Sequence, residues 1–189
     1  MIEIPDSLNQ IFTKGDVGPA GGLIFYDAGS LQNWGRYLEV APNGWHGPSG
    51  DPKRIFCDVK VNLRYLPQNY DIYSIGAGKR NTIEIVKRCE KGAAKTASQY
   101  AGGGKKDWYL PSINELAELA AFVLNRKSWR MNDSEKPKRI MKGFTSYPYW
   151  SSTIDDEEHG MSFMQYLSYG EQWTSPFGIS NYVRPIRAF

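Results

Sequence analysis

Residues 147–189 read YPYWSSTIDDEEHGMSFMQYLSYGEQWTSPFGISNYVRPIRAF and combine many aromatic side chains with two strand-like segments. In the first segment, residues 162–168, successive side chains point to opposite faces of a strand. One face carries Phe163, Gln165 and Leu167, and the other carries Met164, Tyr166 and Ser168. Gly170 then permits a turn and the extended pattern resumes at 171–174, so the stretch predicts a β-hairpin.

The predicted hairpin has the composition of a recognition surface. We expect Met164, Tyr166, Tyr169 and Trp173 to point outward, because large amphipathic side chains on an exposed face are typical of binding hot spots. The alternative is that several of them belong to the core, since a register shift of one residue exchanges the two faces completely.

The composition of the whole chain favours one loop-rich domain. The chain has 189 residues, of which 41% are hydrophobic and 14% aromatic, enough for one domain with a substantial core. Nineteen glycines and eleven prolines between short apolar runs favour an α+β fold over a helical bundle or a doubly wound sheet. We expect an N-terminal extension at 1–14 and a single binding domain at 15–189.

The charge is nearly balanced, at 23 basic against 20 acidic residues and a net charge of +3. Such a balance indicates neither nucleic acid nor an anionic membrane as a partner. No run approaches the roughly 18 to 20 apolar residues of a membrane helix, so we expect no membrane insertion. The first residues also lack the basic start and apolar run of a secretory signal.

The two cysteines, Cys57 and Cys89, fit either one disulfide in an exported protein or two free thiols in a cytoplasmic one. We favour free thiols. His46 and Cys57 do not have the spacing of zinc ligands, so no metal site is expected there.

Four further elements follow from local patterns. Residues 23–26 and 36–41 predict two strands that pair as a hairpin around a turn at 27–35. Asn81–Glu84 resembles a capping box that opens a helix to Lys91, with Ile83, Val86 and either Ile85 or Cys89 inward; residues 93–100 continue it as far as Gly102. Ser112–Glu115 is a second capping box, whose helix runs to about Asn125.

Two segments have no regular pattern. Residues 42–78 predict long ordered loops, which are either functional or structural insertions held by their aromatic residues. Residues 128–142 are polar and basic, and we prefer a solvated loop there to a site for phosphates or sulfated glycans.

Six blocks of sequence carry a resemblance to a known family. They are GPAGGLIFYD (18–27), GRYLEVAP (35–42), GAGKRNT (76–82), DWYLPSINEL (107–116), YWSST (149–153) and VRPIRAF (183–189). In this order they resemble the bacterial DUF1566 group, which includes the C-terminal domain of a Legionella collagen-like adhesin. The resemblance implies a C-type-lectin-like fold, with a small twisted antiparallel sheet, two helices and long loops.

The resemblance also implies kinship with the variable proteins of diversity-generating retroelements, whose C-terminal segment is rewritten on a fixed scaffold. It assigns a scaffold role to Trp150, Ser151, Ser152, Val183 and Arg184. It assigns display positions to Met164, Tyr166, Ser168, Tyr169, Glu171, Trp173, Thr174 and Ser175. We add Tyr149, Glu157, His159 and Phe177 to this candidate ligand-binding set.

These observations predict a non-enzymatic receptor or adhesin module, without a cofactor, that binds a protein or glycan ligand on another cell or surface. A cell-surface, secreted or phage-associated location is favoured. The main alternative is a structural or assembly domain of a larger surface or phage fibre, in which the aromatic residues form subunit contacts.

Two enzymatic functions and calcium-dependent sugar binding have less support in the sequence than a binding module. Formylglycine-generating enzymes share the broad fold, but they need C-terminal cysteines and none follows Cys89. A hydrolase would need a carboxylate pair from the acidic run 155–158 with His159, and such a run on a loop is seldom catalytic. The Glu-Pro-Asn and Trp-Asn-Asp motifs of calcium-dependent lectins are absent, and the acidic run is expected to be a solvated turn.

Overall fold

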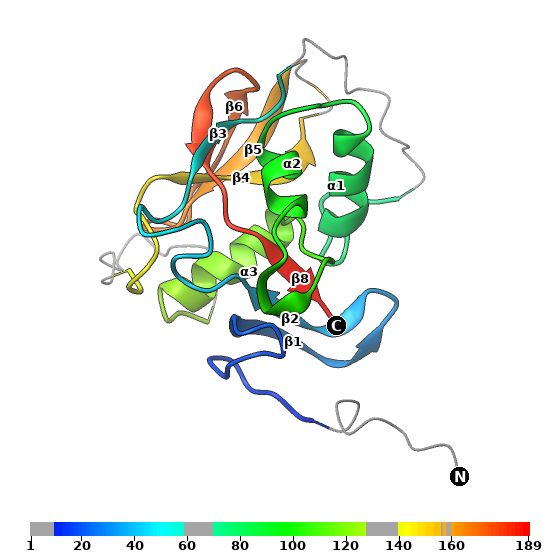
Figure 1. Cartoon of the computed structure of the whole chain (residues 1–189), viewed down its shortest axis with the longest axis vertical. Helices are drawn as coiled ribbons and strands as arrows, with labels where there is room; N and C mark the ends of the chain where they lie inside the picture. Colours follow the sequence, from blue (N-terminus) through cyan, green and yellow to red (C-terminus); the bar gives the residue numbers. More distant parts are fainter. Residues whose placement is uncertain (1–9, 59–69, 128–139, 156, 158–159) are drawn as a thin grey trace.

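The computed structural model describes residues 10–58, 70–127, 140–155, 157 and 160–189. These residues form an α+β structure with two sheets (Figure 1). The first sheet has the strand order β1-β2-β8, made of β1 (Leu23–Gln32), β2 (Gly35–Val40) and β8 (Ile186–Ala188). The second has the order β3-β7-β4-β5-β6, made of β3 (Lys53–Ile55), β7 (Ser180–Tyr182), β4 (Pro148–Ile154), β5 (Met161–Tyr166) and β6 (Gln172–Pro176).

The strands pair antiparallel with one exception, since β4 and β7 run parallel where Tyr149 faces Tyr182. The parallel pair arises because the chain passes from β6 to the other side of β4 before β7 begins. The expectation of one small antiparallel sheet is therefore wrong in two respects, the number of sheets and this pair.

The described helices are α1 (Gly78–Val86), α2 (Ala93–Ser98) and α3 (Ile113–Val123), with a 3-10 turn η3 (Gly102–Gly104). Helix α1 contacts β4 and helix α2 contacts β3, whereas α3 contacts β1 of the first sheet and both β4 and β5 of the second. Helix α3 therefore lies between the two sheets, as Figure 1 shows.

The core has two main parts, one on each face of the five-stranded sheet. The first part packs α1 and α2 against β4 and β5, and contains Phe56, Ile85, Trp150, Met164 and Val183. The second part packs α3 against both sheets, and contains Leu38, Leu116, Leu119, Tyr149 and Leu167. Neighbouring residues of β4, Tyr149 and Trp150, thus enter different parts of the core and are both fully buried.

A buried ionic network joins the glycine-rich entry of the chain to its C-terminal strand. The Arg187 guanidinium bonds to Glu39 and to Asp107, and one Glu39 oxygen accepts hydrogen bonds from the backbone N–H groups of Ala20 and Gly22. A Cβ atom at Gly22 would lie 2.1 Å from the Val40 carbonyl oxygen, so only glycine fits there.

The beginning of the described chain also packs into the fold. Phe12, inside the expected extension 1–14, is buried against Tyr37 and Phe189, with ring centroids 5.4 and 5.6 Å away. The first sheet therefore holds both an N-terminal aromatic residue and the last residue of the chain.

Several predicted elements are confirmed. The hairpins β1–β2 and β5–β6 form, and the long loops of 42–58 and 70–77 are interrupted by only the short strand β3. The capping box at α3 is present in full, since Ser112 Oγ accepts from the Glu115 N–H and the Glu115 carboxylate accepts from the Ser112 N–H. Strand β1 is longer than expected, because residues up to Gln32 pair where a turn at 27–35 was predicted.

The first predicted helix differs from the structure more than the other predicted elements do. Helix α1 begins at Gly78, and Asn81 lies inside it with its side chain bonded to Tyr70 and to the Ile72 carbonyl. The capping box at Asn81 was therefore wrong. The helix ends at Val86, and α2 is a separate helix after Gly92, whose φ of 129° interrupts helical geometry. Ile83, expected inward, is 50% exposed.

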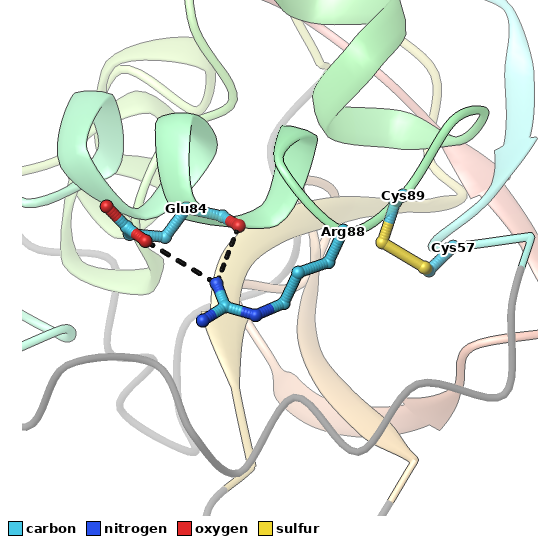
Figure 2. The surroundings of a disulfide bond; sticks show 4 residues. All are labelled: Cys57, Glu84, Arg88 and Cys89. Carbon is cyan, nitrogen blue, oxygen red and sulfur yellow. Dashed lines mark hydrogen bonds and ion pairs between the residues drawn. A yellow bond between two sulfur atoms is a disulfide. The ribbon is translucent and has the colours of Figure 1, made fainter.

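The prediction of free thiols is wrong, because Cys57 and Cys89 form a buried disulfide (Figure 2). The bond links the segment after β3 to the turn after α1, across 32 residues of sequence. Beside it, the Arg88 guanidinium bonds to the carbonyl and the carboxylate of Glu84. Composition alone does not reveal such a pairing, since it depends on the packing of two distant segments.

Candidate functional site

The twelve candidate ligand-binding residues do not share one surface. Five of them are buried, namely Tyr149, Met164, Ser168, Ser175 and Phe177. Two are half-buried, Tyr166 and Thr174, and four are exposed, Glu157, Tyr169, Glu171 and Trp173. His159 lies outside the described residues, so its position stays a prediction.

The expected outward face of β5 is wrong for Met164 and Ser168. Met164 pairs with Trp150 across the ladder and enters the first part of the core. Ser168 is buried and donates to the Ser146 carbonyl oxygen. The alternation itself is real, but the sheet is covered on both faces, so neither face of β5 is free to display all of its side chains.

The other buried candidates have structural partners. Phe177 stacks on Phe56 with ring centroids 4.7 Å apart, and Ser175 pairs with Ser162 across the ladder. The Tyr149 hydroxyl donates to Asp51, and burial together with this carboxylate raises the pKa of Tyr149 above the ordinary phenol range. These side chains support the site without reaching its surface.

The exposed candidates of the β5–β6 hairpin are Tyr169, Glu171 and Trp173. We call these three residues the hairpin surface. Thr174 follows Trp173 on β6, so its side chain points to the opposite face of the strand. Tyr169 is 46% exposed and Trp173 is 59% exposed, while the indole N–H of Trp173 donates to the Glu171 carboxylate at 3.4 Å. Trp173 lies on β6, one of the two edge strands of the five-stranded sheet.

The turn beneath the hairpin surface is fixed by hydrogen bonds. The Gly170 N–H donates to the Tyr166 carbonyl oxygen, and the Tyr166 N–H donates to the Glu171 carbonyl oxygen. The fully buried side chain of Gln165 donates to the Gly170 carbonyl oxygen and accepts from Gln172. Gln165 was expected to face the core, and it does so as the polar support of this turn.

The acidic run has little described structure. The Asp155 carboxylate accepts from the Glu157 backbone N–H, and the Glu157 side chain is exposed. Asp156, Glu158 and His159 lie outside the described residues, so the carboxylate pair considered above is untested. Among the residues that the structure describes, no three His, Cys, Asp or Glu side chains lie where they could hold a metal ion.

Besides Glu39, two buried carboxylates, Asp51 and Glu115, hold distant segments together. Asp51 accepts from Trp45, Tyr149 and the Arg184 guanidinium, and the Arg184–Asp51 ion pair is 2.8 Å long and almost fully buried. Glu115 accepts from Ser112, Gly76 and Tyr109, and burial raises its pKa to about 7. A carboxyl so perturbed is often catalytic, but here every oxygen is engaged by the protein itself.

The prediction from sequence missed a pocket of about 700 Å³ that shares no residue with the hairpin surface. It is lined by Trp45, His46, Arg54, Ile55, Glu90, Lys91, Gly92, Lys95, Thr96, Gln99 and Tyr100. Its residues come from the loop after β2, from β3, and from α2 with the segments on either side of this helix, so no sequence motif marks them. The only signal was the aromatic content of the long loop that begins at residue 42.

Comparison of the chain with protein-family models, with curated proteins and with solved structures finds no match. No helix in the described ranges has the length and apolarity needed to cross a bilayer. What the protein does must therefore follow from the chemistry of its own surfaces.

Proposed function

We propose that this protein is a non-enzymatic ligand-binding module of C-type-lectin-like fold, as its resemblance to the DUF1566 group implies. It binds a protein or glycan ligand on another cell or surface through the hairpin surface. The observation that carries the proposal is the exposed indole of Trp173, which lies on an edge strand and donates to the Glu171 carboxylate, while Tyr169 is exposed in the turn that precedes this strand.

The exposure of the aromatic residues supports this reading. Tryptophan and tyrosine offer a large contact area and a polar tip, and lose few rotamers on binding. Tyr169 projects from a turn whose backbone is held by Gln165, and Trp173 projects from β6, which pairs with β5, so a ligand would order little of the protein when it binds. Glu171 adds an acceptor for hydroxyl or N–H groups of the ligand.

The burial of the scaffold positions and the exposure of some display positions also support the proposal. The scaffold positions implied by the resemblance, Trp150, Ser151, Ser152, Val183 and Arg184, are all buried. Among the implied display positions, Tyr169, Glu171 and Trp173 are exposed, and Tyr166 and Thr174 are half-buried. Met164, Ser168 and Ser175 are buried, and we exclude them from direct contact with a ligand.

The test is adhesion of the purified protein to a glycan array and to a panel of cell surfaces. We expect the double variant Tyr169→Ala and Trp173→Ala to lose at least about tenfold in affinity, because these residues would be the hot spots. Leu31→Ala is the matched control, since Leu31 is 81% exposed on β1 of the other sheet. Equal binding by wild type and double variant would exclude the hairpin surface as the contact.

One observation favours a second function, assembly with further copies or with a fibre. Strand β6 is an edge strand, and an open edge offers backbone donors and acceptors to another strand. Pro176 at the end of β6 limits how far such pairing extends. Sedimentation that depends on protein concentration in the wild type, and no longer does in Trp173→Ala, would favour assembly over ligand display.

A further inference from the structure

The pocket of about 700 Å³ carries an excess of positive charge. Arg54, Lys91 and Lys95 line it, against a single carboxylate, Glu90. Within the described part of the chain none of the three cations forms an ion pair, and the Arg54 guanidinium bonds only to the Lys53 carbonyl and to His46 Nε2. Three cations that form no ion pair with the described residues and outnumber the one carboxylate of a concave site favour an anionic ligand.

The aromatic wall of the pocket is fixed in position. Trp45 and Tyr100 meet edge to face with ring centroids 5.2 Å apart. The Trp45 indole N–H donates to Asp51 at 2.7 Å, and Asp51 is itself held by the buried Arg184, while Tyr100 packs on Trp108. The rings are therefore in place before any ligand arrives, which lowers the entropic cost of binding.

The disulfide and backbone hydrogen bonds fix the side of the pocket that residues 90–92 form. Residues 90–92 follow Cys89 directly, and the Cys57–Cys89 bond ties them to the segment after β3 (Figure 2). Cys57 also forms a backbone bridge with Gly92, and the Ala93 N–H donates to the Phe56 carbonyl oxygen. A Cβ atom at Gly92 would lie 2.2 Å from that carbonyl oxygen, so the two walls are in close contact.

We propose that this pocket binds a small aromatic anion, a flat ring that carries a carboxylate or a phosphate. The anionic group is held by Arg54, Lys91 and Lys95, and the ring lies against Trp45 and Tyr100. The volume is within the range of small-molecule sites. The aromatic rings of Trp45 and Tyr100 in the lining favour a flat ring over a sugar, whose hydroxyl groups each need a polar partner.

The test is isothermal titration of the full chain with two anionic probes, 2-naphthoate and 2-naphthyl phosphate, and a neutral probe, 2-naphthalenemethanol. We expect at least one anion to bind about tenfold or more tightly than the neutral probe. The stronger of the two anions identifies the group, carboxylate or phosphate. If neither anion binds more tightly than the neutral probe, or neither binds at all at about 10 mM, the proposal is overturned.

Two neighbouring residues of β3 provide a matched pair of variants. Arg54→Gln removes a cation from the pocket, and we expect it to weaken binding of the anion about tenfold. Lys53→Gln removes the same charge from the adjacent position, whose ammonium lies 5.2 and 5.0 Å from the ring centroids of Tyr147 and Tyr182, and should leave binding unchanged.

A second variant guards against an indirect effect of Arg54 on the fold. Lys95→Gln lies on α2, where glutamine has nearly the helix propensity of lysine, so the helix is retained. It should also weaken binding of the anion while the circular dichroism spectrum stays that of the wild type. Wild-type affinity in both Arg54→Gln and Lys95→Gln would place the anion elsewhere and refute the proposal.

Discussion

Buried carboxylates anchor the loops of this protein at the level of single residues. Asp51 holds Trp45, Tyr149 and Arg184 together, although these residues lie far apart in the sequence. Glu115 was visible in advance as half of a capping box, because that motif is local. Asp51 was not visible, since none of its three partners stands at a spacing that would suggest a contact.

The ion pair of Asp51 leads to a first prediction. Asp51→Asn leaves the Arg184 guanidinium buried without a counter-ion, and we expect a loss of about 3–5 kcal/mol in the free energy of unfolding. Asp27→Asn is the control, because Asp27 pairs with Arg36 at the surface and should cost about 1 kcal/mol or less. Urea denaturation followed by tryptophan fluorescence measures both, and equal small losses would contradict the buried pair.

Glu115 leads to a prediction about pH. Burial raises the pKa of Glu115 from 4.5 to about 7, so between these values the folded chain keeps a proton that the unfolded chain releases. The contribution of this group to stability is therefore present in full below the lower pKa and is lost as the pH rises through the upper one. We expect unfolding at about pH 5 to cost up to about 3 kcal/mol more than at about pH 8.

The measurement is a series of urea denaturation curves across this pH range, with Glu115→Gln as the comparison. The variant has no titrating carboxyl at this position, so its stability should change less with pH. The lowered pKa values of Asp27, Glu84 and Asp107 act in the opposite sense, but only below their ordinary values near 4. A slope that persists unchanged in Glu115→Gln would assign it to another group.

At the scale of helices and strands, the elements that depend on local sequence were predicted well, and those that depend on tertiary contacts were not. Helix α3 was predicted closely because its cap and apolar stripe are contained within a dozen residues. Helix α1 was not, because Asn81 and its neighbours bond to distant groups instead of to their own helix end. The same holds for β5, whose alternation was correct but whose outward face depended on what packs over the sheet.

The disulfide between the segment after β3 and the turn after α1 gives a third prediction. It closes a loop of about 30 residues, which should stabilise the fold by about 3–4 kcal/mol through the unfolded state. Reduction should therefore lower the midpoint of urea denaturation, and mass spectrometry after alkylation of the unfolded, unreduced protein should find no labelled thiol. Two labelled cysteines under those conditions would restore the original prediction of free thiols.

At the scale of the whole molecule, the chain forms two sheets where its sequence predicted one. Composition and turn residues were enough to predict an α+β domain with long loops. They could not predict that both faces of the five-stranded sheet are buried. Five of the twelve candidate residues are therefore buried, and the exposed candidates are those of the hairpin surface and Glu157. The disulfide, in turn, fits the expected cell-surface or secreted location, because such bonds persist in oxidising compartments.

The packing of Phe12 on Phe189 has a mechanical meaning. Both rings pack with Tyr37 of β2, so a pulling force applied between residues 12 and 189 would enter and leave the molecule at neighbouring points of the first sheet. Tension would load the pairing of β8 with β2, and the five-stranded sheet that carries the hairpin surface would lie outside the direct path of the load. A ligand bound at the hairpin surface would then stay in place while the pairing of β8 with β2 bears the tension.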